Sequence, residues 1–106
     1  MKGLVEVKNP TTKVHIGYLR GGVVPPQYEA QLTHSLWVAG PDYKFIDFFS
    51  FDNRLPVGLQ SFLVREWRDE AKIAAHAEAV ALFLSEIHEE VDALMALKEA
   101  QEEMYA

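Results

Sequence analysis

The sequence has 106 residues, of which 49% are hydrophobic and 25% charged, so we expect residues 1–106 to form one folded domain and exclude a wholly disordered chain. It has no cysteine, no apolar stretch of about 18 residues and no signal-peptide run, which excludes disulfides, thiol catalysis and a membrane partner and predicts a cytoplasmic location. The net charge is −6, but ten acids against two lysines in residues 69–106 leave residues 1–68 at +2, so DNA contact is expected only at the front of the chain.

The first quarter of the chain predicts one strand and then a loop. Residues 3–8 alternate apolar and charged side chains, which indicates a half-buried strand that ends at Asn9-Pro10. Residues 11–24 hold three glycines among mixed residues. We therefore expect a loop there, with at most one irregular helical turn around residues 15–19.

The middle of the chain predicts a short helix and two strands. Pro25-Pro26 favours a helix start, and apolar residues recur at helical spacing until Gly40-Pro41. Residues 43–51 and 61–67 read as strands, because they are rich in aromatic and β-branched types. The turn between them permits an antiparallel hairpin with a longish loop.

The last third of the chain predicts a long acidic helix over residues 70–106, with Asp69 as its N-cap. Apolar residues recur there at alternating steps of four and three, as in a coiled coil. A helix of this length reaches beyond a domain of this size, so its far end is expected to fray, fold back or pack against another copy of the chain.

The tripeptide Glu6-Val7-Lys8 is the sharpest chemical signal. Side chains two residues apart in a strand share one face, about 7 Å apart at ~3.4 Å per residue. A carboxylate and an ammonium so placed suit phosphodiester hydrolysis, because the first binds a divalent cation and the second orients water or stabilises charge on phosphate. Glu-x-Lys is also a common tripeptide, so a solvated strand face is the alternative.

The segments LVEVKNPTT, YLRGG, PPQYEAQLTHSLWVAG, FFSFDNRL and REWRDE stand in this order along nearly the whole chain. Together they resemble the lambda-exonuclease and YqaJ-type viral recombinase family. The resemblance implies an α/β fold with a partial restriction-endonuclease-like core, arranged as strand, helix, strand, strand and long C-terminal helix. It also implies a phage-type DNA exonuclease that uses Mg²⁺, with Mn²⁺ as an alternative, on double-stranded DNA ends in recombination.

The resemblance assigns roles to particular residues. It implies that Glu6 binds the metal, that the Val7 backbone carbonyl completes the metal shell and that Lys8 is the catalytic lysine. It also implies that Gln31 lies beside the attacking water. Three further residues are weaker candidates for DNA contact: His15, Arg20 and Arg54.

One feature of the family has no counterpart in the sequence. The family carries an aspartate at least about ten residues before its Glu-x-Lys, whereas Glu6 is only the sixth residue here. A magnesium site would be left with one carboxylate. The other nearby acids, Asp42, Asp47 and Asp52, do not occupy the family's position, and turn or surface acids are the simpler interpretation. The chain therefore resembles the C-terminal half of such a nuclease.

Three function classes stay open at this point. The first is a DNA exonuclease, or part of one, whose site is completed by an N-terminal partner polypeptide or in a homo-oligomer. The second is a catalytically inactive nuclease-fold remnant that serves a recombination-associated or self-assembly role. The third is a helical interaction module unrelated to nucleases, which would require the strand carrying Glu6 to be uncoupled from Gln31.

Overall fold

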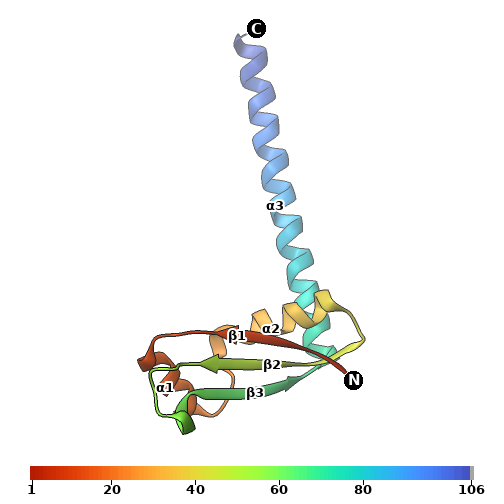
Figure 1. The fold of residues 1–106 in the computed structure, drawn as a ribbon. Coiled ribbons are helices and arrows are strands. Elements are labelled where there is room, and N and C mark those ends of the chain that lie inside the picture. Colours follow the sequence, from red (N-terminus) through yellow and green to blue (C-terminus); the bar gives the residue numbers. More distant parts are fainter. Residues whose placement is uncertain (106) are drawn as a thin grey trace. The chain divides into compact units, whose positions relative to one another are not determined.

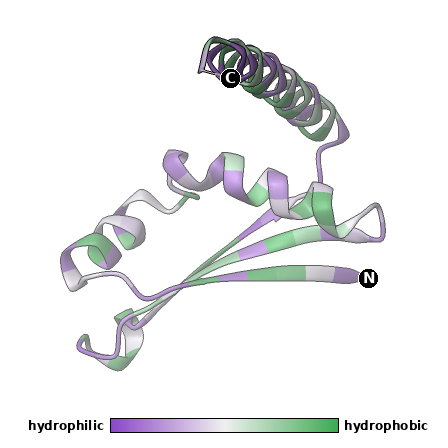
Figure 2. Cartoon of the chain, turned by 90° about the horizontal axis from the view of Figure 1, so that it is seen from above, coloured by the Kyte–Doolittle hydropathy of each residue, from purple (hydrophilic) through white to green (hydrophobic). Residues whose placement is uncertain are grey.

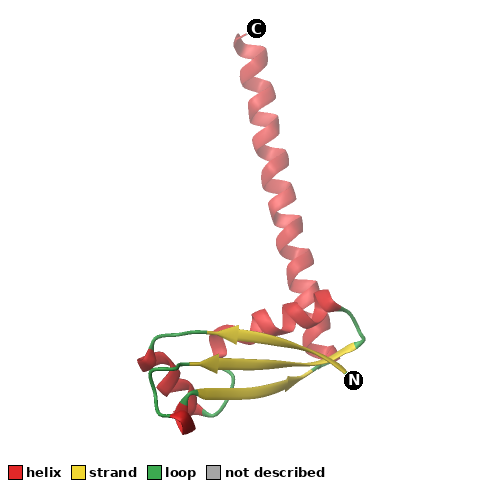
Figure 3. Cartoon of the chain, in the orientation of Figure 1, coloured by secondary structure: helices red, strands yellow, loops and turns green. Residues whose placement is uncertain are grey.

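The computed structural model describes residues 1–105. The chain divides into two compact units, with the boundary after Ala74. The first unit, Met1–Ala74, is a mixed α/β structure, and the second begins at Ala75 and is helical (Figures 1 and 3). The elements in chain order are β1 (Lys2–Lys8), α1 (Thr12–Gly21), α2 (Pro26–Ala39), β2 (Tyr43–Phe51), the 3₁₀ turn η1 (Val57–Leu59), β3 (Ser61–Trp67) and α3 (Glu70–Tyr105).

The three strands form one sheet in the order β1-β2-β3. β1 and β2 run parallel, with Glu6 opposite Phe48, because two helices carry the chain back between them. β2 and β3 run antiparallel, with Asp47 opposite Arg65, so the predicted hairpin is confirmed. The register places Glu6 and Lys8 on the face of the sheet that Phe48 shares.

The core lies between that face of the sheet and helices α1 and α2, which Figure 2 shows on one side of the strands. Phe48 is fully buried at the centre of this core, and the rings of Phe48 and Tyr18 of α1 form a T-shaped pair at a centroid distance of 5.5 Å. The buried hydrophobic residues are Tyr18, Val24, Leu32, Leu36, Ile46, Phe48, Phe62 and Ile73. This core joins all three strands to the helices that carry the chain from β1 to β2.

Helix α1 replaces most of the predicted loop over residues 11–24, so that prediction is wrong. The Thr11 hydroxyl caps the helix by accepting a hydrogen bond from Val14 N, and Gly22 ends it in the left-handed conformation at φ 69°. His15 and Tyr18 are buried one turn apart on its inner face. Burial of this face outweighs the poor helix propensity of the glycines within the helix.

Helix α2 begins at the second of the two prolines and ends before Gly40, as predicted. Leu32 and Leu36, four residues apart, are its buried residues. The Arg68 guanidinium, just after β3, donates hydrogen bonds to the backbone oxygens of Leu36 and Gly40 at 2.9 Å. Both oxygens also accept a backbone hydrogen bond, Leu36 O from Gly40 N and Gly40 O from Tyr43 N, so the arginine adds a second donor to each and ties α2 to the end of β3.

Helix α3 starts as predicted, because Asp69 Oδ1 accepts hydrogen bonds from the backbone nitrogens of Ala71 and Lys72. Ile73, in its first turn, is buried in the core of the first unit. In the second unit the side chains of Ile87 and Val91 are exposed, along with many other apolar ones. Within residues 1–105, no helix is both long and apolar enough to cross a bilayer.

The opposite face of the sheet carries the Asp47–Arg65 ion pair and several exposed apolar side chains. Val5 and Val7 of β1 are 61% and 54% exposed, and Leu63 and Trp67 of β3 are each 56% exposed. Gly3 belongs to the same face and has no room for a side chain, because a Cβ there would overlap the Phe45 ring. One face of the sheet therefore carries the core, and the other presents apolar side chains at its surface.

Candidate active site

Glu6 and Lys8 form an ion pair on the helix-covered face of β1. Lys8 Nζ lies 3.2 Å from Glu6 Oε1, and the two side chains are 23% and 27% exposed, respectively. This partial exposure leaves both charged groups accessible to a ligand, while the surrounding protein restricts the conformations of the two side chains. Its second carboxylate oxygen, Glu6 Oε2, accepts no hydrogen bond from any residue in 1–105.

Gln31 of α2 closes this pair into a three-residue cluster. Its Oε1 atom accepts a hydrogen bond from Lys8 Nζ at 3.3 Å, and its Nε2 atom donates one to Glu6 Oε1 at 3.3 Å. The amide orientation follows from these two bonds, since only its oxygen accepts and only its nitrogen donates. Residues 25 and 23 positions apart in the sequence thus meet at one point.

Tyr28 is a fourth member of the site, and sequence reasoning gave it no chemical role. The Lys8 ammonium lies 4.5 Å from the centroid of its ring. The ring packs against Phe48 at 5.4 Å. The spacing of three residues between Tyr28 and Gln31, which puts both on one helix face, is the signal that could have found it.

His15 does not contact solvent, so its predicted DNA contact is wrong. The residue is fully buried. Its Nε2 atom lies 2.9 Å from the Leu59 backbone oxygen, and its Nδ1 atom lies 2.8 Å from Ser50 Oγ. A carbonyl oxygen only accepts, so Nε2 donates to it, and in the neutral ring Nδ1 then accepts from the serine hydroxyl. The histidine ties α1 to the end of β2 and the turn η1.

The two candidate arginines differ in their surroundings. Arg20 lies in the last turn of α1 and is exposed, so its guanidinium is available for a phosphate. Arg54 donates through Nε to Asp52 Oδ1 at 2.8 Å and through Nη2 to the Pro10 backbone oxygen at 3.0 Å. Arg54 therefore clasps the segment after β1 to the β2–β3 loop, although 60% of its side chain is exposed.

The three other acids considered from the sequence do not join Glu6. Asp42 is exposed before the start of β2, at the opposite end of the parallel strands from Lys8. Asp47 lies on the other face of the sheet, where Arg65 binds both of its oxygens at 2.8 and 3.0 Å. Asp52 is buried, and hydrogen bonds from the Arg54 side chain hold its pKa at about 2.

The site fits only part of the magnesium centre that the resemblance implies. Glu6 supplies one carboxylate with a free oxygen, and Val7 is next to it on the strand. Residues 1–105 contain no group of three His, Cys, Asp or Glu side chains that could hold a metal ion. Magnesium is bound through oxygen ligands at near-octahedral geometry, so these residues alone make an incomplete site.

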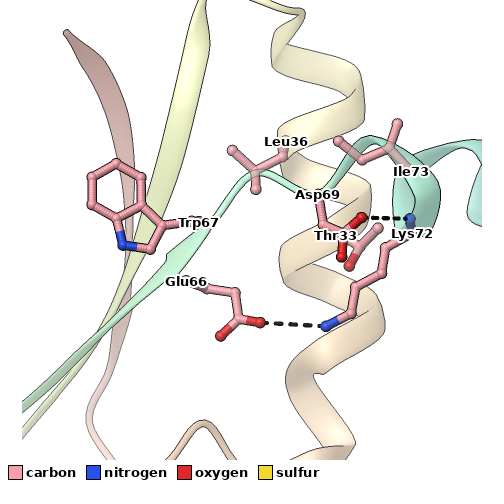
Figure 4. Close-up of a pocket in the computed structure, with 7 residues that line it drawn as sticks. All are labelled: Thr33, Leu36, Glu66, Trp67, Asp69, Lys72 and Ile73. Carbon is pink, nitrogen blue, oxygen red and sulfur yellow. Dashed lines mark hydrogen bonds and ion pairs between the residues drawn. The ribbon is translucent and has the colours of Figure 1, made fainter.

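A small pocket lies elsewhere in the first unit, between α2, the end of β3 and the start of α3. Figure 4 shows the Glu66 carboxylate pointing toward the Lys72 ammonium, at a distance of 3.5 Å. Leu36 and Ile73 supply its apolar wall. None of Glu6, Lys8 and Gln31 lines this pocket. Its two acids are already engaged, Glu66 with Lys72 and Asp69 with the first turn of α3, so we assign it no chemistry.

Two solved structures are similar to this chain. A crystal structure of LHK-Exo, an alkaline exonuclease from Laribacter hongkongensis, matches with a TM-score of 0.80 and 36% identity, over 88% of this chain and 47% of that one. A crystal structure of LHK-Exo in complex with dAMP matches with a TM-score of 0.81 and 36% identity, over 89% and 47%. No family model and no curated protein matches the chain.

The similarity establishes that this chain has the fold of a restriction-endonuclease-like nuclease. The chain spans about half the length of the exonuclease that it matches. The three strands and the long C-terminal helix expected from the resemblance are present in this structure.

Proposed function

We propose that this chain carries part of the active site of a phage-type DNA exonuclease, a magnesium- or manganese-dependent enzyme that degrades double-stranded DNA ends in recombination. The observation that carries the proposal is the closed contact of Glu6, Lys8 and Gln31 on a nuclease fold. If Glu6 and Lys8 were only solvated residues on a strand, there would be no reason for the Gln31 amide of α2 to hydrogen-bond to both of them.

Each member of the cluster has a distinct proposed task. Lys8 donates hydrogen bonds to the attacking water or to phosphate oxygens, where negative charge grows in the transition state. Gln31 fixes the position of the Lys8 ammonium relative to the Glu6 carboxylate through its two hydrogen bonds. Its amide is also close enough to this pair to orient the attacking water. Glu6 offers Oε2, with the neighbouring Val7 carbonyl, as its share of the ligands for a divalent cation.

We propose that the rest of the site comes from polypeptide outside residues 1–105. The cluster holds one carboxylate, and half of the matching exonuclease has no counterpart here. Within residues 1–105, β1 pairs with β2 alone, so its other edge keeps free backbone donors and acceptors. The exposed Val5 and Val7 side chains beside that edge favour a covering element, because folded proteins rarely leave such apolar surface open.

A chimera tests the proposal: this chain replaces the matching part of LHK-Exo, which leaves the remainder of that exonuclease to complete the site. The substrate is 5′-phosphorylated duplex DNA with Mg²⁺ or Mn²⁺. We expect cleavage by the chimera, and a loss of about 10²–10³-fold in Glu6→Gln and in Lys8→Met. Lys2→Met is the matched control, because Lys2 is an exposed lysine at the other end of the same strand.

A second candidate is the inactive nuclease-fold remnant, which the single carboxylate favours. In that case the chimera would fold without cleaving DNA, and Glu6→Gln would change nothing. The third class, an unrelated helical interaction module, is disfavoured because Gln31 contacts both Glu6 and Lys8.

A further inference from the structure

Besides the Glu6 carboxylate and the Gln31 amide, the Lys8 ammonium has a third neighbour, the aromatic ring of Tyr28. The distance of 4.5 Å from Nζ to the ring centroid lies within the range of cation–π attraction. A lysine ammonium ends a flexible four-carbon stem, so its two polar contacts at 3.2 and 3.3 Å leave it room to swing. An aromatic face beneath the ammonium removes part of that freedom.

Tyr28 is itself held firmly. Its ring packs on Phe48, which is fully buried, at a centroid distance of 5.4 Å. Burial of Tyr18, together with the neighbouring Tyr28 side chain, raises the pKa of Tyr18 to about 12. The core thus fixes the ring on which Lys8 rests.

We propose that Tyr28 is a positioning residue, whose ring face holds the Lys8 ammonium beside Glu6 and Gln31. The inference rests on the proposed function, because it assigns Tyr28 to the same site. Tyr28 and Gln31 lie one turn apart on α2, so a single helix face supplies both the ring and the amide. The ring acts through Lys8 and makes no contact with the reacting atoms.

The proposal separates the ring from the hydroxyl. Tyr28→Phe keeps the ring and removes only its hydroxyl, whereas Tyr28→Leu removes the ring and keeps an apolar side chain on Phe48. Tyr18→Phe is the matched control, because it removes the neighbouring hydroxyl and leaves the Tyr28 ring in place. If the ring face is what matters, both Phe variants behave like the parent chain and only the Leu variant departs from it.

The first readout is the NMR shift of the Lys8 ε-methylene in the full chain, since a nucleus above an aromatic face is shifted upfield. We expect this resonance upfield of those of Lys13 and Lys98. The upfield shift should survive Tyr28→Phe and Tyr18→Phe and be lost in Tyr28→Leu. A Lys8 resonance that Tyr28→Leu leaves in place would overturn the inference without touching the role of Lys8 itself.

The second readout is DNA cleavage by the LHK-Exo chimera. We expect Tyr28→Leu to cut the cleavage rate about tenfold and the two Phe variants to stay within about twofold, at unchanged KM for DNA. Full activity in Tyr28→Leu overturns the positioning role while the proposed function stands. Absence of cleavage in the parent chimera overturns the proposed function and, with it, the positioning role.

Discussion

Gln31 bridges Glu6 and Lys8: it accepts a hydrogen bond from the ammonium and donates one to the carboxylate, each at 3.3 Å. The amide is exposed on its own helix and contributes nothing to the core. Its position is therefore better explained by the site than by stability. This contact turns a common tripeptide on a strand into a candidate for phosphodiester chemistry.

The contact predicts that Gln31 affects activity and leaves stability alone. Gln31→Leu should lower DNA cleavage by the LHK-Exo chimera by about 10–10²-fold, because the lysine and the carboxylate lose their common partner. The free energy of unfolding, measured by urea denaturation of the chain, should change by less than about 0.5 kcal/mol. Gln27→Leu, on an exposed position of the same helix, is the matched control. Unaltered cleavage by Gln31→Leu would remove Gln31 from the site.

The buried contacts of His15 predict the opposite pattern. His15→Leu leaves the Ser50 hydroxyl and the Leu59 carbonyl without partners, so the chain should lose roughly 2–4 kcal/mol of unfolding free energy. Replacement of the exposed Lys13 by Met should leave stability nearly unchanged. Thermal and urea unfolding of both variants check this. Wild-type stability in His15→Leu would show that these two hydrogen bonds contribute little.

The Asp52–Arg54 clasp predicts a defined acid dependence of stability. The folded state holds the pKa of Asp52 at about 2, below its ordinary value of 3.8, so the ionised carboxylate stabilises the fold. This stabilisation is complete above about pH 5 and is lost as the pH falls toward 2. Urea denaturation between pH 2 and 6 should show a weaker acid dependence in Asp52→Asn. An identical dependence in Asp52→Asn and the parent chain would rule the clasp out as its cause.

The apolar residues of the second unit predict self-association. Ile87, Val91 and Leu94 are spaced by four and three residues and are 42%, 48% and 56% exposed, a pattern that suits a helix–helix seam. We expect light scattering to report an oligomer of the intact chain and a smaller species for Val91→Asp. Glu90→Gln serves as the control. A monomeric parent chain would contradict this prediction.

The sequence predicted the elements whose periodicity and end signals agree. The three strands, helix α2 and the Asp69 cap follow from alternation, from the paired prolines and from a carboxylate before a helical run. Helix α1 was missed because its glycines suggested a loop. Its inner face depends on a buried histidine, and only the Ser50 and Leu59 partners from distant segments make that burial favourable.

The spacing of residues in the sequence predicted less of the candidate site than of the fold. Alternation placed Glu6 and Lys8 on one face, but no local pattern links them to Gln31, which was found only by resemblance. Tyr28 received no chemical role from the sequence because a tyrosine at helical spacing normally belongs to the core. Its ring does pack on Phe48, and its contact with Lys8 depends on how the helix lies over the strand.

The central claim is that this chain holds one part of a nuclease site and needs further polypeptide to complete it. The most direct test is the rate at which 5′-phosphorylated duplex DNA is degraded, with Mg²⁺ or Mn²⁺, by the chain alone and by the LHK-Exo chimera. We predict background activity for the chain alone, because one carboxylate holds the metal too loosely for charge stabilisation, and Glu6-dependent cleavage by the chimera. Robust cleavage by the chain alone that disappears in Glu6→Ala would contradict this account, and would mean that a second carboxylate comes from Asp42, Asp47, Asp52 or another copy of the chain.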